Sequence, residues 1–148
     1  MATPLCVVFD TNVALALEVF ADPRLVELRG CWDRDELQAI ADEETLAEYE
    51  RVLRYPELRL DEAAAVAAGL RYRARCTIVP HDSAIQPALP RCRDPDDQKF
   101  LLLAQRADAR WLLTRDKALL ALRKKVRFGI AQPEALWGPG REGLRCGL

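Results

Sequence analysis

Three aspartates in the sequence stand where their carboxylates could act together on a phosphate ester. Asp10 directly follows the apolar run Leu5–Phe9, Asp116 lies two residues past another apolar run, and Asp97 lies near the start of an expected helix. Clustered carboxylates repel one another when ionised, so they need a compensating cation. Oxygen ligands of this kind suit Mg²⁺ or Mn²⁺, which can activate a bound water and stabilise charge on a phosphate. The arrangement would serve metal-assisted phosphodiester hydrolysis.

Each of these aspartates also has a simpler interpretation. Asp10 and Asp116 could cap the helices that follow them, and Asp97 could interact with the dipole of its helix. Asp94 and Asp96 are typical turn and cap residues. Convergence of the three residues from distant parts of the sequence is what favours the functional interpretation.

The spacing of apolar residues predicts strands that alternate with helices. Strands are expected over Leu5–Phe9, Leu37–Ala41, Cys76–Val79, Trp111–Thr114 and Val126–Ile130. Helices are expected from about Val13, over Pro23–Cys31, Glu43–Arg54, Glu62–Arg75 and Asp96–Ala107, from Asp116, and over Pro133–Trp137. Asp42 and Asp61 are suited to capping two of these helices. The proline-containing stretch 81–93 is expected to form a loop.

Alternating strands and helices predict a parallel sheet covered by helices on both faces. Right-handed crossovers place the carboxyl ends of such strands along one edge, where ligands bind. Asp10, Asp97 and Asp116 are therefore expected at that edge. We predict one domain over residues 1–137, followed by a loose, glycine-rich tail over residues 138–148.

The helix expected over Glu43–Arg54 offers a further carboxylate. Leu46, Tyr49, Val52 and Leu53 form its apolar face. Glu48 and Glu50 lie on opposite borders of that face, and periodicity alone does not choose between them.

Composition narrows the classes of protein. The 22 Lys and Arg residues nearly balance the 23 Asp and Glu residues, so a nucleic-acid ligand would need local basic patches, for which Arg71–Arg75 and Arg123–Arg127 are candidates. Five scattered cysteines and one histidine argue against structural zinc and favour reduced thiols. No apolar run approaches the roughly 20 residues of a membrane span, so we expect a cytoplasmic protein.

Four segments resemble, in order and spacing, the motifs of the PIN-domain family. They are Val7–Val13, Glu44–Leu53 followed by Pro56, Cys92–Leu101 and Leu113–Lys117. The resemblance extends from Val7 to about Leu136 and is nearest to the branch of toxin components of toxin-antitoxin systems. It implies a single doubly wound three-layer α/β/α domain with a mainly parallel sheet.

The resemblance also implies an activity and a site. Members are metal-dependent ribonucleases, so RNA is the implied substrate, a small antitoxin an implied partner, and a homodimer a common assembly. Carried over by position, the acidic quartet is Asp10, Glu48, Asp97 and Asp116, with Asp10, Asp97 and Asp116 as metal ligands for Mg²⁺ or Mn²⁺. Supporting roles fall to Thr11, Asn12, Asp94 and Thr114, and substrate contacts to Arg115 and Lys117.

The fourth motif departs from the family pattern. Arg115 stands where glycine is usual, and Ala118 replaces a second acidic residue, which puts the role of Asp116 in doubt. One alternative is therefore a catalytically weak or inactive module that binds RNA or a protein. Another is a haloacid-dehalogenase phosphatase with Asp10 as nucleophile, although that chemistry would want an acid where Asn12 stands.

Overall fold

The first apolar run of the chain forms the central strand of the sheet, β1 (Leu5–Phe9), in a computed structural model that describes residues 3–80 and 88–138. Four further strands lie parallel to it in the order β3-β2-β1-β4-β5. They are β2 (Leu37–Ala41), β3 (Thr77–Ile78), β4 (Trp111–Leu113) and β5 (Gly129–Ala131). The predicted parallel sheet is confirmed.

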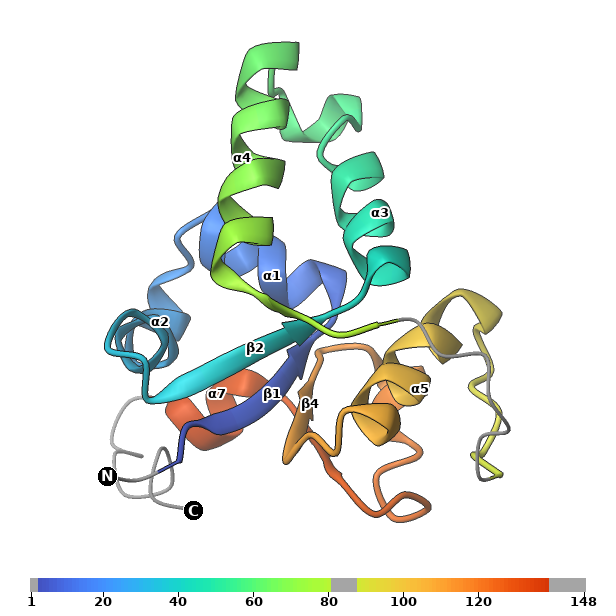
Figure 1. Ribbon diagram of the computed structural model, residues 1–148. Helices are drawn as coiled ribbons and strands as arrows, with labels where there is room; N and C mark the ends of the chain where they lie inside the picture. The colour runs from blue at the N-terminus through green and yellow to red at the C-terminus, as the bar shows by residue number, and fades with distance from the viewer. Residues whose placement is uncertain (1–2, 81–87, 139–148) are drawn as a thin grey trace.

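Helices connect the strands and cover both faces of the sheet (Figure 1). The α-helices are α1 (Thr11–Glu18), α2 (Val26–Asp33), α3 (Glu43–Val52), α4 (Glu62–Arg75), α5 (Gln98–Arg106), α6 (Lys117–Leu120) and α7 (Pro133–Trp137). Short 3₁₀ turns cover Pro23–Leu25 (η1), Pro56–Leu58 (η2) and Pro95–Asp97 (η3). None of the helices in the described residues is long and apolar enough to cross a bilayer.

Alternation along β1 divides the core into two layers, because successive side chains of a strand point to opposite faces. Val7 and Phe9 pack with buried residues of α1 to α4 and with Trp137 of α7. Val8 packs on the opposite face against Phe100 and Leu101 of α5. The domain is therefore a three-layer α/β/α fold, and both faces of β1 are buried, as its apolar sequence predicts.

The strand order reverses between β1 and β4. The chain moves outward from β1 through β2 to β3, and then returns to the other side of β1 to form β4 and β5. In open α/β sheets the crevice beyond the carboxyl ends of the strands at such a reversal is the usual ligand site. Figure 1 shows α3 and α4 projecting side by side above these ends, while α5 lies against the β1–β4 side.

Local signals placed several helix starts correctly. The Asp42 side chain accepts from the backbone N–H of Thr45 (2.9 Å), and the Asp61 side chain accepts from that of Ala64 (2.7 Å). Both predicted caps are confirmed. The helix expected from about Val13 begins at Thr11 instead, because Asp10 caps it.

Several predicted boundaries were wrong. The helix expected over Pro23–Cys31 is divided into η1 and α2, and the one expected from Asp96 begins with η3. The strand expected over Cys76–Val79 comprises only Thr77–Ile78, and Cys76 is instead the C-cap of α4, where its backbone N–H donates to the carbonyl of Tyr72. Residues 81–87 of the predicted loop and residues 139–148 of the predicted tail lie outside the described part of the chain.

The last strand begins at Gly129 rather than Val126, after a series of turns. Gly129 pairs with Trp111, and a β-carbon at Gly129 would lie only 2.2 Å from the Trp111 ring. A side chain there would displace the indole, so glycine permits the close approach of β4 and β5.

Candidate active site

Asp10 is the most enclosed of the predicted carboxylates. Its side chain accepts from the backbone N–H of Val13 (2.9 Å), which caps α1, and from the hydroxyl of Thr114. Burial raises the pKa of Asp10 to about 6, because the charged form loses hydration, although both hydrogen bonds act in the opposite direction. The capping and site interpretations of Asp10 are therefore compatible.

Thr114 connects two of the predicted site residues beyond β4. Its hydroxyl donates to Asp10 and accepts from the backbone N–H of Asp116 (2.9 Å), and its side chain is fully buried. Asp116 in turn caps α6 by accepting from the N–H of Ala118 (2.8 Å). The end of β4 thus fixes Asp116 beside Asp10.

Asp97 reaches the same site from the segment that directly precedes α5. It ends η3, where its backbone N–H donates to the carbonyl of Asp94 (3.1 Å). Its pKa is raised to about 7, first by burial and then by the hydrogen bond and negative charge of Asp116, with smaller contributions from Asp94 and Asp10. Its Oδ2 atom is buried and has no hydrogen-bond partner among the described residues.

Gln98 anchors the segment that precedes Asp97. Its side-chain amide donates to the carbonyl of Pro90 (3.1 Å) and accepts from the backbone N–H of Cys92 (2.7 Å). These two bonds fix the approach to η3. The Asp94 side chain meanwhile caps that turn through the N–H of Asp96 (3.0 Å), the turn role expected for it.

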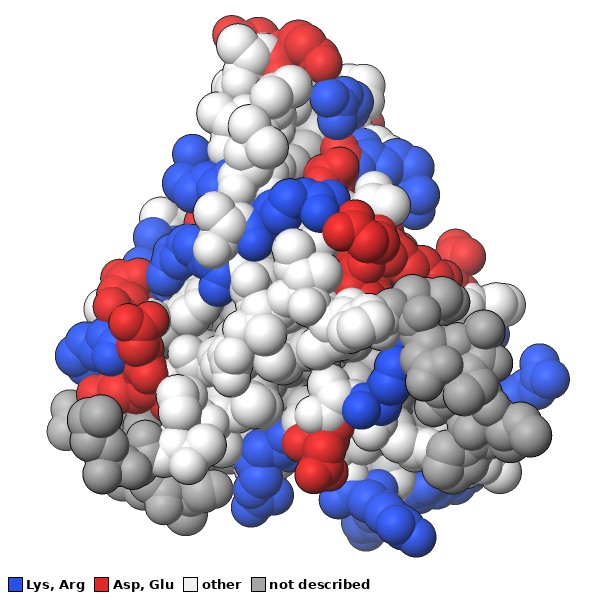
Figure 2. Space-filling view, viewed as in Figure 1, with Lys and Arg blue, Asp and Glu red and all other residues white. Residues whose placement is uncertain are grey.

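Glu48 and Glu50, which periodicity left equivalent, lie in different surroundings. Glu48 accepts from the hydroxyl of Thr11 and forms an ion pair with Lys99 (2.7 Å). Glu50 forms an ion pair with Arg73 of α4 (2.9 Å). Figure 2 shows acidic side chains gathered over the start of α3, with basic side chains beside them over α4. Glu48 belongs to the carboxylate cluster and Glu50 to the contact between α3 and α4.

The clustered carboxylates line a cavity of about 360 Å³, which we call the acidic cavity. One part of its lining consists of Asp10, Thr11, Asn12, Glu48, Asp97 and Asp116. The other part is apolar and includes Phe20 and Tyr55. The four predicted acidic residues therefore share one concave surface at the reversal of strand order.

The two predicted substrate-binding residues do not line this cavity. The Arg115 guanidinium forms ion pairs with Glu134 of α7 and with Asp22 (both 3.0 Å), so it joins α7 to the turn before η1. Lys117 is exposed on α6. Lys99, which the sequence did not single out, lies 2.7 Å from Glu48 of the cluster, and Arg51 lies 3.9 Å from the same carboxylate. The spacing of two residues between Lys99 and Asp97 was the available signal.

The donor set suits a hard divalent cation. Within residues 3–80 and 88–138, no three acidic, histidine or cysteine side chains already stand as a set that could hold a metal ion. However, burial is the main cause of the raised pKa values of Asp10 and Asp97, and neighbouring carboxylates add to it, while the buried Oδ2 of Asp97 has no hydrogen-bond partner among the described residues. A bound cation would offset both the lost hydration and the repulsion. The residues therefore fit a cation if the side chains of Asp97 and Asp116 turn toward it.

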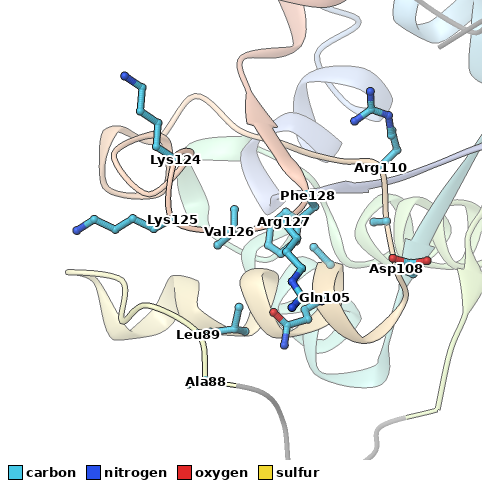
Figure 3. Close-up of a pocket in the computed structure, with 12 residues that line it drawn as sticks. Ala88, Leu89, Gln105, Asp108, Arg110, Lys124, Lys125, Val126, Arg127 and Phe128 are labelled. Atoms are coloured by element: carbon cyan, nitrogen blue, oxygen red, sulfur yellow. The ribbon is translucent and has the colours of Figure 1, made fainter.

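A second and larger hollow, of about 840 Å³, lies at the opposite edge of the sheet (Figure 3). Its lining includes the end of α5 and the residues just before β4 and β5, with Arg110, Lys124, Lys125 and Arg127 as cations. We call it the basic groove. Figure 3 shows Arg127 directed toward Gln105 of α5, whereas Lys124 and Lys125 extend outward. It holds part of the basic run noted in the sequence, but none of the carboxylates of the acidic cavity.

Comparison with known proteins identifies the family. No curated protein matches the chain. The sequence matches the family described as PIN domain over residues 6–118, which spans β1 to the first turn of α6 and includes all four clustered carboxylates. The chain therefore belongs to the PIN-domain family.

Proposed function

We propose that this protein is a divalent-metal-dependent endoribonuclease that hydrolyses RNA phosphodiester bonds at the carboxylate cluster. PIN domains are in general nucleases that use divalent metal ions. The observation that carries the proposal is the meeting of Asp10, Glu48, Asp97 and Asp116 around one cavity at the reversal of strand order. Carboxylates that lie close together repel one another and so destabilise the fold. Their concentration at such a crevice therefore indicates a functional site.

The residues around the acidic cavity have separate proposed roles. Thr114 and the Val13 N–H orient the carboxylate of Asp10, while η3 and Gln98 hold Asp97 opposite it. A Mg²⁺ or Mn²⁺ ion bound by Asp10, Asp97 and Asp116 would supply Lewis-acid chemistry for hydrolysis. Glu48, fixed by Thr11 and Lys99, would orient groups at the edge of that site.

Lys99 has a role of its own in this scheme. Its ammonium contacts Glu48 at 2.7 Å and also donates to the carbonyl of Asp96 at 2.6 Å. A cation held there reduces the repulsion between the cluster and an incoming phosphate. It would thereby favour entry of a polyanionic substrate into an acidic cavity.

We further propose that the protein is the toxin component of a toxin-antitoxin system, active in the cytoplasm as a homodimer and held inactive by a small antitoxin. The sequence resemblance supports this role, and the four described cysteines are free thiols, as expected in a reducing compartment. Expression alone should slow growth, and co-expression of the antitoxin should restore it. Normal growth with abundant protein would contradict the toxin role but not the nuclease activity.

A module that binds RNA or a protein without cleavage is the second candidate. Two observations favour it: the described side chains form no ready-made metal set, and Arg115 and Ala118 alter the fourth motif. Such a module would retain RNA binding, but metal would add no hydrolysis.

RNA cleavage with matched variants distinguishes the two candidates. Purified protein is incubated with labelled single-stranded and structured RNAs in Mn²⁺, in Mg²⁺ and in EDTA, alongside Asp10→Asn and Asp97→Asn. We expect cleavage by the wild type that EDTA and each variant abolish, since an amide keeps the shape of the ligand but removes its charge. Absence of cleavage, or equal cleavage by the variants, would overturn the nuclease proposal and leave the binding module.

A further inference from the structure

Two aromatic side chains stand exposed at the acidic cavity. Phe20 is 59% exposed and Tyr55 is 44% exposed, and both line the same cavity as Asp10, Asp97 and Asp116. A large apolar ring left in water carries a cost that burial would remove. Neither ring packs against another aromatic ring within the described part of the chain.

The backbone fixes the position of each ring. Phe20 follows α1, and its N–H donates to the carbonyl of Leu15 (3.0 Å), while Ala21 takes a left-handed conformation (φ 46°) that turns the chain away. Tyr55 follows α3, and its N–H donates to the carbonyl of Val52 (2.9 Å), just before Pro56. Both rings therefore stand on short, hydrogen-bonded turns rather than on long loops.

A nucleobase is the ligand that such rings suit. Bases have flat π faces that stack on aromatic side chains, and stacking tolerates any base sequence. The base itself is neutral, so it can approach these walls while its phosphate lies toward the carboxylates and their cation. In a duplex the faces of each base are already covered by neighbouring bases, and only an unpaired nucleotide can present one.

We propose that Phe20 and Tyr55 form a stacking surface that holds the base of an unpaired nucleotide next to the scissile phosphate. This inference rests on the proposed nuclease function. The two residues act in binding and specificity, and the hydrolysis itself is left to the carboxylates. A docking patch for a protein partner is the competing interpretation of the same exposed rings.

Binding measured without cleavage tests the stacking surface. Single-stranded oligoribonucleotides with 2-aminopurine placed at each position in turn are titrated into the Asp97→Asn protein and into the same protein with Phe20→Leu or Tyr55→Leu. The Mn²⁺ concentration is raised until it saturates the Asp97→Asn protein, which offsets the weaker metal binding of that variant. Leucine keeps an apolar side chain but removes the flat face. Leu70→Ala, at a 61% exposed residue of α4 outside the cavity, is the matched control.

We expect 2-aminopurine fluorescence to be quenched at one or two positions in single strands and not in duplexes. Each Leu variant should lose the quenching and bind about tenfold more weakly, a loss within the range for one stacked base. Leu70→Ala should bind as its parent does. No binding, equal binding of duplexes, or equal binding by the Leu variants would overturn the inference, and the last result would favour a protein-docking patch.

Cleavage kinetics separate this inference from the function on which it rests. With a protein that is otherwise wild type, Phe20→Leu and Tyr55→Leu should raise KM about tenfold and change kcat little. Active wild type with unchanged KM in both variants would refute the stacking surface but leave the nuclease intact. An inactive wild type that still shows the quenching would refute the nuclease and retain the surface.

Discussion

The acidic cavity and the basic groove lie at opposite edges of one sheet, and α5 runs from one toward the other. Asp97 precedes the start of α5, whereas Gln105 near its end lines the basic groove. The cavity gathers like charges that are buried or half-buried, two of which have raised pKa values. The groove carries exposed cations, and Lys124, Lys125 and Arg127 form no ion pair with any described residue.

This difference shows which charge cluster carries a cost. Exposed like charges are screened by water and salt, so a basic surface of this kind costs little stability. Buried like charges must instead be compensated or protonated. The acidic cavity is therefore the edge at which function opposes stability, and the basic groove by itself indicates only a cationic surface.

The sharpest contrast within the acidic residues is between Glu48 and Glu50 on the same helix. Glu48→Gln should reduce RNA cleavage about 10- to 100-fold, because it removes a charge that Thr11 and Lys99 hold at the cavity. Glu50→Gln removes only the ion pair with Arg73 and should change the rate less than about twofold. Steady-state cleavage of one labelled RNA measures both, and equal effects would contradict the assignment of Glu48.

The second prediction concerns stability in the absence of metal. The folded-state pKa values of Asp10 (about 6) and Asp97 (about 7) lie above the ordinary value of 3.8, so the folded state binds more protons than the unfolded state between these limits. Stability from these groups is therefore present at low pH and is lost as the pH rises from about 4 to about 7. The Tm of the metal-free protein should fall by roughly 2–6 °C across this range, since water screens the half-buried Asp97.

Thermal unfolding in EDTA between pH 5 and 8 checks this sign. The Tm of Asp97→Asn should fall less steeply with pH than the Tm of the wild type. Addition of Mn²⁺ at pH 8 should restore the lost stability, because the ion binds the folded state. Asp22 gives the opposite behaviour, because its hydrogen bonds with Arg24 lower its pKa, but that contribution is lost only in stronger acid. A Tm that rises from pH 5 to 8, or an unchanged slope in Asp97→Asn, would contradict the account.

The smallest effect is expected at the basic groove. Lys125→Ala should change kcat for RNA cleavage less than about twofold, because the groove lies at the other edge of the sheet and its cations are solvated. Lys99→Ala, at the acidic cavity, is the informative comparison and should reduce activity much more. A large loss of kcat in Lys125→Ala would contradict the claim that the activity depends on the acidic cavity and not on the basic groove.

The sequence predicted the meeting of the aspartates better than it predicted the rest of the site. Asp10 and Asp116 follow strands, and the carboxyl ends of parallel strands share an edge, so their proximity follows from local patterns. Glu48 could not be separated from Glu50 in this way, because both border the apolar face of α3. Only contacts with Thr11, Lys99 and Arg73, distant in the sequence, distinguish them.

Other parts of the molecule depended on contacts between distant segments. Phe20 and Tyr55 lie in turns, which have no periodicity to indicate the direction of a side chain. Arg115 was expected at the substrate because of its neighbour Asp116, but Asp22 and Glu134 hold it elsewhere. The roles proposed for the quartet remain predictions.

Direct titration with Mn²⁺ tests the central claim, that the carboxylate cluster is a divalent-cation site. Isothermal titration calorimetry at pH 7.5 or above, where a pKa of about 7 leaves Asp97 largely charged, compares the wild type with Asp97→Asn and with Glu50→Gln. The account predicts Mn²⁺ binding by the wild type, at least about tenfold weaker binding by Asp97→Asn, and no change in Glu50→Gln. No binding by the wild type, or equal binding by Asp97→Asn, would contradict it.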